Sequence, residues 1–182
     1  MLDLDFSILN AIQNIRCPFL DWFMPAVSFL ANGGWFWIAL AVVFLIFKKT
    51  RRCGIMMGVA LLLGLLFGNL IIKNLVARAR PYTYAEALVK EGDLLINALT
   101  DYSFPSGHTL ASFNAANMIF AWNKRAGIPA LILAAVIAFS RLYLYVHFPT
   151  DILGGFVLAI ICSVMSFYIV KILADKVFKG KI

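Results

Sequence analysis

Residues 54–72 read GIMMGVALLLGLLFGNLII, a run without a charged residue that Lys73 ends. A transmembrane helix needs about 20 predominantly apolar residues, so this run predicts a membrane-spanning helix. The whole composition agrees, because 63% of the 182 residues are hydrophobic and only 14% are charged. A soluble domain has about a quarter charged residues, and a disordered chain lacks such hydrophobicity. The sequence therefore excludes both classes and indicates a helical membrane protein.

Further apolar segments complete the predicted bundle. Three of them are clear, namely residues 109–122, 128–139 and 152–173. Residues 18–47 are also mostly apolar, but as one helix they would be about 45 Å long, which exceeds a hydrocarbon core of about 30 Å. We therefore expect a short span, a tight turn at Asn32-Gly33-Gly34, and a second span that begins at Trp35.

The predicted fold is an all-α polytopic membrane helical bundle with about six transmembrane helices. Residues 6–15 add an N-terminal interfacial helix, because their apolar side chains recur at helical spacing. Residues 1–182 are expected to form a single domain. The three cysteines are scattered, and only two histidines are present, so we expect neither a disulfide framework nor a metal site or other cofactor.

The formal charge of +7 results from 16 Lys and Arg against 9 Asp and Glu. In a soluble protein this excess would suggest nucleic acid, whereas in a membrane protein cationic loops mark the cytoplasmic side. The cationic groups lie within residues 48–52, 124–125 and 171–181, which six alternating spans place on one side. We therefore predict a multi-pass protein of the cell (inner) membrane, with both termini cytoplasmic, residues 73–106 and 142–150 outside, and no nucleic-acid partner.

Ionisable residues also gather at the outer ends of the predicted spans. They are Lys73, Arg78, Arg80, His108, Arg141, His147 and Asp151. Charged groups at membrane depth are costly and mark a functional site by default. Several fixed cations suit a phosphate, because arginine donates in a bidentate way and lysine adds a point charge. Ser106 and Gly107 open a helix whose first amides would face the same anion.

The two histidines divide the chemistry in this interpretation. His147 precedes Asp151 by four residues, so the carboxylate can fix one ring nitrogen and leave the other as a nucleophile. His108 would then protonate the leaving oxygen as a general acid. The phosphoryl oxygens would be held by Lys73, Arg80 and Arg141.

Two sets of charged residues fall outside this scheme. Arg78 could contact a headgroup or a second phosphate, or it could simply snorkel to the membrane surface. The acidic residues of the outer loop are expected to form a solvated surface: Glu86, Glu91, Asp93 and Asp101.

Three clusters carry a resemblance to a known family. They read Lys73-Asn-Leu-Val-Ala-Arg-Ala-Arg80-Pro81, then Pro105-Ser106-Gly107-His108, then Ser140-Arg141 followed by His147 and Asp151. In order and spacing they are similar to the motifs of the phosphatidic acid phosphatase type 2 (PAP2) superfamily, across residues 73–151. The resemblance implies a membrane enzyme that hydrolyses phosphomonoesters or diphosphates of lipids without metal, through a phosphohistidine.

The resemblance also implies roles for the matched residues. His147 resembles the nucleophile, Asp151 its orienting carboxylate, and His108 the general acid. The phosphate-binding positions of the family match Lys73, Arg80, Ser106, Gly107, Ser140 and Arg141.

The leading hypothesis is an integral membrane lipid phosphatase that acts at the extracytoplasmic face on a lipid phosphate. Undecaprenyl diphosphate is the favoured substrate, because small members with little beyond the three motifs resemble bacterial carrier-lipid phosphatases. Phosphatidic acid and phosphatidylglycerophosphate stay open, since the apolar surface that grips lipid tails has no sequence signature. A lipid phosphotransferase is a second enzyme hypothesis. A lipid-phosphate transporter without hydrolysis belongs to another class, and it leaves the His–Asp spacing unexplained.

Overall fold

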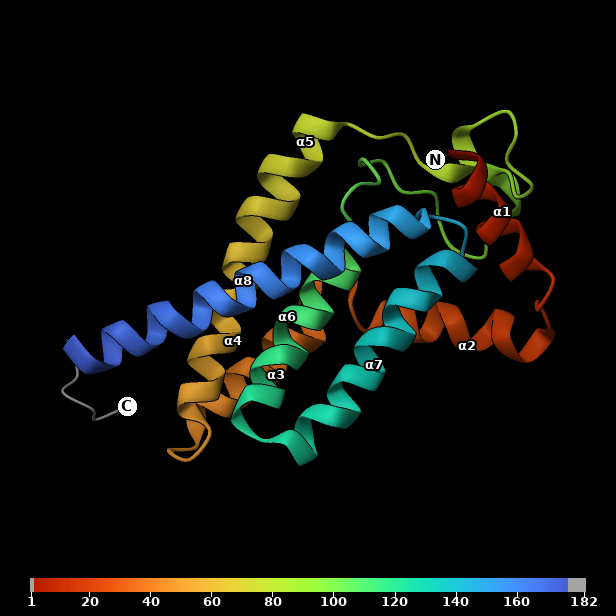
Figure 1. Ribbon diagram of the computed structural model, residues 1–182. Helices are drawn as coiled ribbons and strands as arrows, with labels where there is room; N and C mark the ends of the chain where they lie inside the picture. The colour runs from red at the N-terminus through yellow and green to blue at the C-terminus, as the bar shows by residue number, and fades with distance from the viewer. Residues whose placement is uncertain (1, 177–182) are drawn as a thin grey trace.

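The structure, a computed structural model, describes residues 2–176, in which all regular elements are helices (Figure 1). Its α-helices are α1 (Leu2–Gln13), α2 (Pro18–Phe29), α3 (Trp35–Ile46), α4 (Arg51–Gly64), α5 (Lys73–Val76), α6 (Gly107–Trp122), α7 (Lys124–Tyr143) and α8 (Pro149–Lys176). A π-helical segment, η2 (Leu65–Ile72), joins α4 to α5, and short 3-10 turns lie at η1 (Asn32–Gly34), η3 (Pro81–Thr83) and η4 (Glu91–Asp93). The predicted all-helical membrane bundle is confirmed. The basic tail residues Lys179 and Lys181 lie outside the described residues.

Several helices are long and apolar enough to cross a membrane. Arg51–Thr83, Lys124–Tyr143 and Pro149–Ala174 meet this criterion singly, and α2 with α3 meets it as a bent pair. Helix α6 has 16 residues and packs against α4, α7 and α8 in the middle of the bundle. All six hydrophobic segments that the sequence indicates are thus helical.

The chain bends between α2 and α3 but does not reverse. The angle between the two helices is 44°, and Gly33 and Gly34 adopt φ values of 58° and 73° at the break. Only glycine adopts such angles without strain, so these residues permit the bend. The predicted break and the second helix from Trp35 are confirmed, but the chain bends there instead of reversing, because paired glycines allow a kink as readily as a reversal.

The bend changes where the two ends of the chain lie. Asp5 of α1 accepts a hydrogen bond from Thr150 in the first turn of α8, at 2.7 Å between the side-chain oxygens. Helix α8 then runs for 28 residues, or about 42 Å, away from this contact. Its last described turn therefore lies at the opposite end of the bundle from α1 (Figure 1). The prediction that both termini are cytoplasmic depends on counting α2 and α3 as two crossings, whereas the bent pair also qualifies as a single span.

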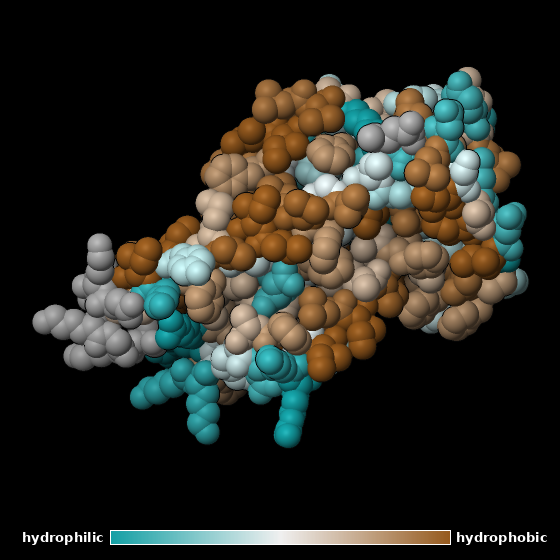
Figure 2. Space-filling view, viewed as in Figure 1, coloured by the Kyte–Doolittle hydropathy of each residue, from teal (hydrophilic) through white to brown (hydrophobic). Residues whose placement is uncertain are grey.

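The surface has the distribution expected of a membrane bundle. Large apolar side chains are exposed along the outer faces of the long helices, among them Leu62, Ile132, Leu153 and Tyr168. Figure 2 shows such apolar side chains over much of one face, with hydrophilic ones gathered at the lower edge and the upper right. The exposed apolar surface is far more than a soluble monomer tolerates.

The core is closed by small residues and a few buried hydrogen bonds. A Cβ atom on Gly54 would lie 2.8 Å from the carbonyl oxygen of Ala41, so α3 and α4 approach backbone to backbone. The indole of Trp37 donates to the Ser112 hydroxyl at 2.9 Å, which ties α3 to α6. This packing holds α3, α4 and α6 together, and residues of all three helices line one cavity.

Helix α1 packs against α7, α8 and the loop that joins them. The predicted helix over residues 6–15 forms as Leu2–Gln13, with Leu9 fully buried and Asp5 only 2% exposed. Phe6 lies edge-on to Phe148, with ring centroids 5.2 Å apart. Helix α1 therefore covers the loop between α7 and α8.

Candidate active site

A cavity of about 500 Å³ lies between α3, α4 and α6. Five predicted site side chains line it, each from a different part of the chain: Lys73 of α5, Arg80 of the following loop, His108 of α6, Arg141 of α7 and His147 of the α7–α8 loop. Gly107 lines it as well. The cavity continues between α3 and α4 along apolar side chains such as Ile38, Val42, Leu61 and Leu65. A polar head region thus opens into an apolar groove.

Arg141, which lines this cavity, has unpaired donors. Its side chain is buried, with 1% exposure, and one terminal nitrogen donates to the Ser28 hydroxyl of α2. Its Nε and other terminal nitrogen have no hydrogen-bond partner among the described residues 2–176. A buried, unsatisfied charge is costly unless a ligand completes it. Two adjacent guanidinium donors match the two oxygens of a phosphoryl group.

Lys73 and Arg80 share one carboxylate, that of Asp101. The Lys73 Nζ lies 2.5 Å from one oxygen of Asp101, and an Arg80 terminal nitrogen lies 2.5 Å from the other. Burial alone would raise the pKa of Asp101, but Lys73 and Arg80 together lower it to about 2. The carboxylate therefore stays charged across the working pH range. Asp101 is exposed, as predicted for the outer loop, but it also pairs with the two cations because its loop folds back onto them.

His147 lines the cavity, and Asp151 lies beside it behind the lining. The His147 Nδ1 is 3.4 Å from an Asp151 carboxylate oxygen, which also accepts from the Phe148 amide at 2.8 Å. On its other side, the His147 Nε2 lies 3.4 Å from an Arg80 nitrogen. Because arginine can only donate, this contact favours the tautomer with the lone pair on Nε2 and the proton on Nδ1, and Nδ1 makes no hydrogen bond to the described residues. Burial holds the pKa of His147 well below its ordinary value, and the charges of Arg80, Arg141 and Lys73 lower it further.

His108 faces the same cavity from the first turn of α6. Its Nε2 lies 2.8 Å from the side-chain oxygen of Asn32, in the bend between α2 and α3. The sequence indicated only a turn at Asn32, and nothing in the local pattern distinguishes a turn asparagine from one that orients a histidine. Asn32 is therefore a site residue that sequence reasoning missed.

Two of the predicted phosphate-binding residues, Ser106 and Ser140, make hydrogen bonds within their own helices. The Ser106 hydroxyl caps α6 by accepting from the Thr109 amide at 3.4 Å. The Ser140 hydroxyl donates to the Ile137 carbonyl, one turn back in α7, at 2.6 Å. Neither side chain belongs to the described lining of the cavity, so they shape the elements that present Gly107 and Arg141.

The Asp101 bridge gives a first prediction. A phosphate that binds Lys73 and Arg80 must displace the Asp101 carboxylate or share the two cations with it. We expect Asp101→Asn to bind vanadate, a phosphate mimic, about fivefold more tightly, the effect of one half-exposed ion pair. Inhibition by vanadate measures this, with Asp93→Asn in the same loop as the matched control. Weaker vanadate binding in Asp101→Asn would show that the carboxylate instead holds the two cations in place.

Comparisons with known proteins agree with this geometry. Residues 53–174 match the PAP2 superfamily. An undecaprenyl-diphosphatase of Sulfolobus acidocaldarius is 33% identical over 141 residues, which cover 76% of this chain and 66% of that relative. Among solved structures, Aquifex aeolicus LpxE superposes with a TM-score of 0.77 at 28% identity, over 91% of this chain and 95% of that one.

A second solved structure is the PAP2-type phosphatidylglycerolphosphate phosphatase from Bacillus subtilis. It superposes with a TM-score of 0.69 at 26% identity, over 97% of this chain and 87% of that one. The family match spans all three sequence clusters, so the resemblance seen in the sequence is confirmed. The chain belongs to the PAP2 superfamily.

Proposed function

We propose that this membrane phosphatase hydrolyses a lipid phosphate or diphosphate without metal, through a phosphohistidine intermediate. One observation carries the proposal: Arg141, which has two unpaired buried donors, lines the same cavity as His147. An anion there would lie within reach of a neutral imidazole nitrogen. The apolar groove beside it suits the tail of a lipid substrate.

In the first step, the His147 Nε2 attacks the phosphorus and the bond to the leaving oxygen breaks. Arg141, Lys73 and Arg80 stabilise the charge that spreads over the phosphoryl oxygens. His108 gives its proton to the leaving oxygen, so the lipid product departs neutral at that atom. Asp151 balances the positive charge that forms on the His147 ring.

In the second step, water replaces the lipid product beside His108. His108 now accepts a proton from the water, whose oxygen attacks the phosphorus and breaks its bond to His147. Inorganic phosphate leaves, and both histidines return to their starting states. Asn32 holds the His108 ring in place during both transfers, at 2.8 Å in the structure.

Undecaprenyl diphosphate is the substrate we favour, because a relative that is 33% identical is named for its hydrolysis. Phosphatidylglycerophosphate is the second candidate, supported by the likeness to the Bacillus subtilis phosphatase. Phosphatidic acid is a third. A phosphotransferase would use the same intermediate with an alcohol in place of water. A transporter without hydrolysis would need the anion site but no neutral histidine.

We also propose that the site opens at the extracytoplasmic face. The cationic loops at residues 48–52 and 124–125 lie at the other end of the bundle, between α3 and α4 and between α6 and α7. Cationic loops favour the cytoplasmic side. On this basis α1 lies outside with the site, and the C-terminal end of α8 lies inside.

Phosphate release in detergent with EDTA present tests the proposal. Undecaprenyl diphosphate, phosphatidic acid and phosphatidylglycerophosphate are compared as substrates, and no loss of rate is expected on adding the chelator. Preference for the diphosphate would support carrier-lipid hydrolysis, whereas preference for a glycerolipid would keep the mechanism and change the substrate. Full inhibition by EDTA, reversed by a divalent metal, would overturn the metal-independent mechanism.

A further inference from the structure

Arg78 is a partly buried cation that the proposed mechanism leaves unused. Its side chain is 17% exposed and lies outside the described lining of the cavity. One terminal nitrogen donates to Asp151 at 2.7 Å and to the Thr150 hydroxyl at 2.6 Å. The other donates to Asp5 at 2.8 Å. Arg78 therefore joins the N-terminal helix to the carboxylate beside His147 and contacts no phosphate site.

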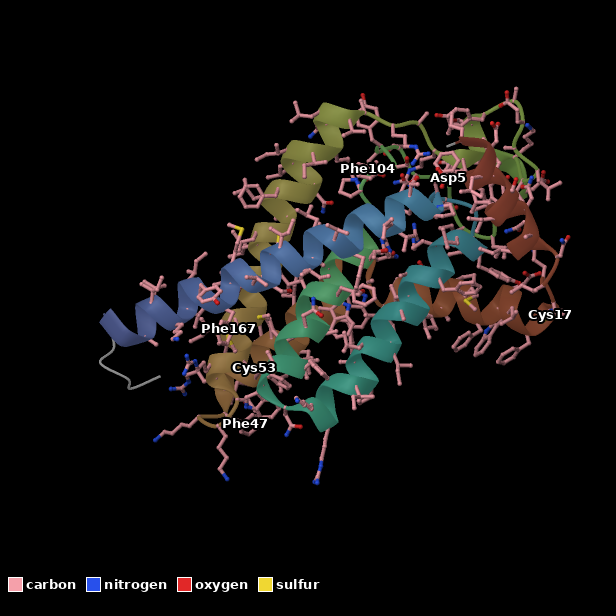
Figure 3. The ribbon with its side chains drawn as sticks, viewed as in Figure 1. Asp5, Cys17, Phe47, Cys53, Phe104 and Phe167 are labelled. Atoms are coloured by element: carbon pink, nitrogen blue, oxygen red, sulfur yellow. The ribbon has the colours of Figure 1, made fainter. Side chains whose placement is uncertain are left out.

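The two carboxylates at this arginine are the most deeply buried acidic groups described. Asp151 is fully buried and Asp5 is 2% exposed. Carboxylates at such depth need a cation and hydrogen bonds to stay charged. The planar guanidinium supplies one nitrogen to each, a geometry that a lysine ammonium cannot reproduce. Figure 3 shows Asp5 at the end of the bundle where α8 begins.

Asp151 is held from both of its oxygens. Arg78 donates to the first oxygen, while the Phe148 amide donates to the second, at 2.8 Å. His147 Nδ1 lies 3.4 Å from that second oxygen. The Arg78 contact thus sets the rotation of the carboxylate and, through it, the oxygen that His147 meets.

Asp5 fixes Arg78 and the start of α8 together. Its second oxygen accepts from the Thr150 amide at 3.2 Å, so α1 caps α8 from outside the helix. The guanidinium carbon of Arg78 also lies 4.0 Å from the centre of the Phe148 ring, against which Phe6 of α1 packs. Arg78 is thereby confined by α1 on one side and by the α7–α8 loop on the other.

We propose that Arg78 and Asp5 are positioning residues that orient Asp151 toward His147, so that helix α1 is part of the active site. The inference rests on the proposed hydrolysis. It assigns to the N-terminal helix the task of holding the His147–Asp151 pair in its reactive geometry. Small displacements of a reacting group cost rate far more than they cost binding.

Asp5→Asn is the first test, with Asp3→Asn on the exposed face of α1 as the matched control. Asparagine keeps the shape of the side chain but removes the charge that holds Arg78. We expect kcat on the preferred lipid to fall about tenfold and KM to stay within about twofold of wild type. The control should keep both constants. A kcat in Asp5→Asn equal to that in Asp3→Asn would overturn the inference.

Arg78→Ala with added methylguanidinium is the second test, and methylammonium is the matched control ion. We expect a fall in kcat of about a hundredfold, partly restored by methylguanidinium and not by methylammonium. His147→Ala should respond to neither ion. Loss of rate with no response to methylguanidinium, in a protein that still folds, would count against positioning by Arg78. If Arg78→Ala does not fold, Asp5→Asn decides alone.

The outcomes separate this inference from the proposed function. A wild-type protein that releases no phosphate from any lipid would overturn the hydrolysis itself. An active wild type whose Asp5 and Arg78 variants keep their kcat would overturn only the positioning role.

Discussion

His147→Ala is expected to lower kcat for lipid phosphate hydrolysis by about 10³-fold or more, because the variant loses the atom that attacks phosphorus. The same variant should form no phosphoenzyme. Quenching the reaction with labelled substrate tests this directly, since a phosphohistidine is labile in acid and stable in alkali. Near-wild-type turnover in His147→Ala would end the covalent mechanism.

His108→Ala provides the contrast for this experiment. Its loss should be large for a lipid alkoxide leaving group and small for a phenolic leaving group, which departs without a proton. His147→Ala should stay inactive on both substrates. Equal behaviour of the two variants on the phenolic substrate would contradict the division of roles between the histidines.

Arg141→Lys is expected to lower kcat/KM about a hundredfold, because a point charge replaces two adjacent donors aimed at one phosphoryl group. The lysine would also lose the contact to Ser28 that orients the arginine. Vanadate inhibition should weaken in parallel with kcat/KM, which separates lost phosphate binding from misfolding.

Arg125→Lys is the matched control for this substitution, because Arg125 is exposed at the start of α7, at the other end of the same helix. It should leave kcat/KM and vanadate inhibition unchanged. If Arg141→Lys retained both properties, the unpaired donors of Arg141 would have no role in phosphate binding.

Local sequence was sufficient for the features that depend on composition and short spacing. The charge-free run at 54–72 predicted a spanning helix, and the segment is continuous helix from Arg51 to Val76. The His147 and Asp151 pair was predicted from a spacing of four, and their side chains lie 3.4 Å apart. The cations Lys73, Arg80 and Arg141 were assigned to one site, and all three line one cavity.

Contacts between distant segments decided the rest. In the sequence, nothing distinguishes Asp101 from the other acidic residues of its loop. In the structure, the loop folds back and Asp101 pairs with Lys73 and Arg80. Asn32 was predicted only as a turn residue, but its side chain contacts His108, which lies 76 positions further along the sequence. Asp5 meets Thr150 from 145 positions away, a distance over which no sequence periodicity carries information.

The sequence by itself thus determined that this chain is a membrane helical bundle and which residues have the chemistry for phosphate. It did so because hydrophobicity, charge and short-range spacing act within a single helix. Only the tertiary structure decided the direction of the chain after Gly33 and Gly34, the end of the bundle at which α1 packs, and the partners of Arg78, Asp101 and His108. Those depend on how helices pack against one another, and a packing contact is a property of two segments that neither segment encodes alone.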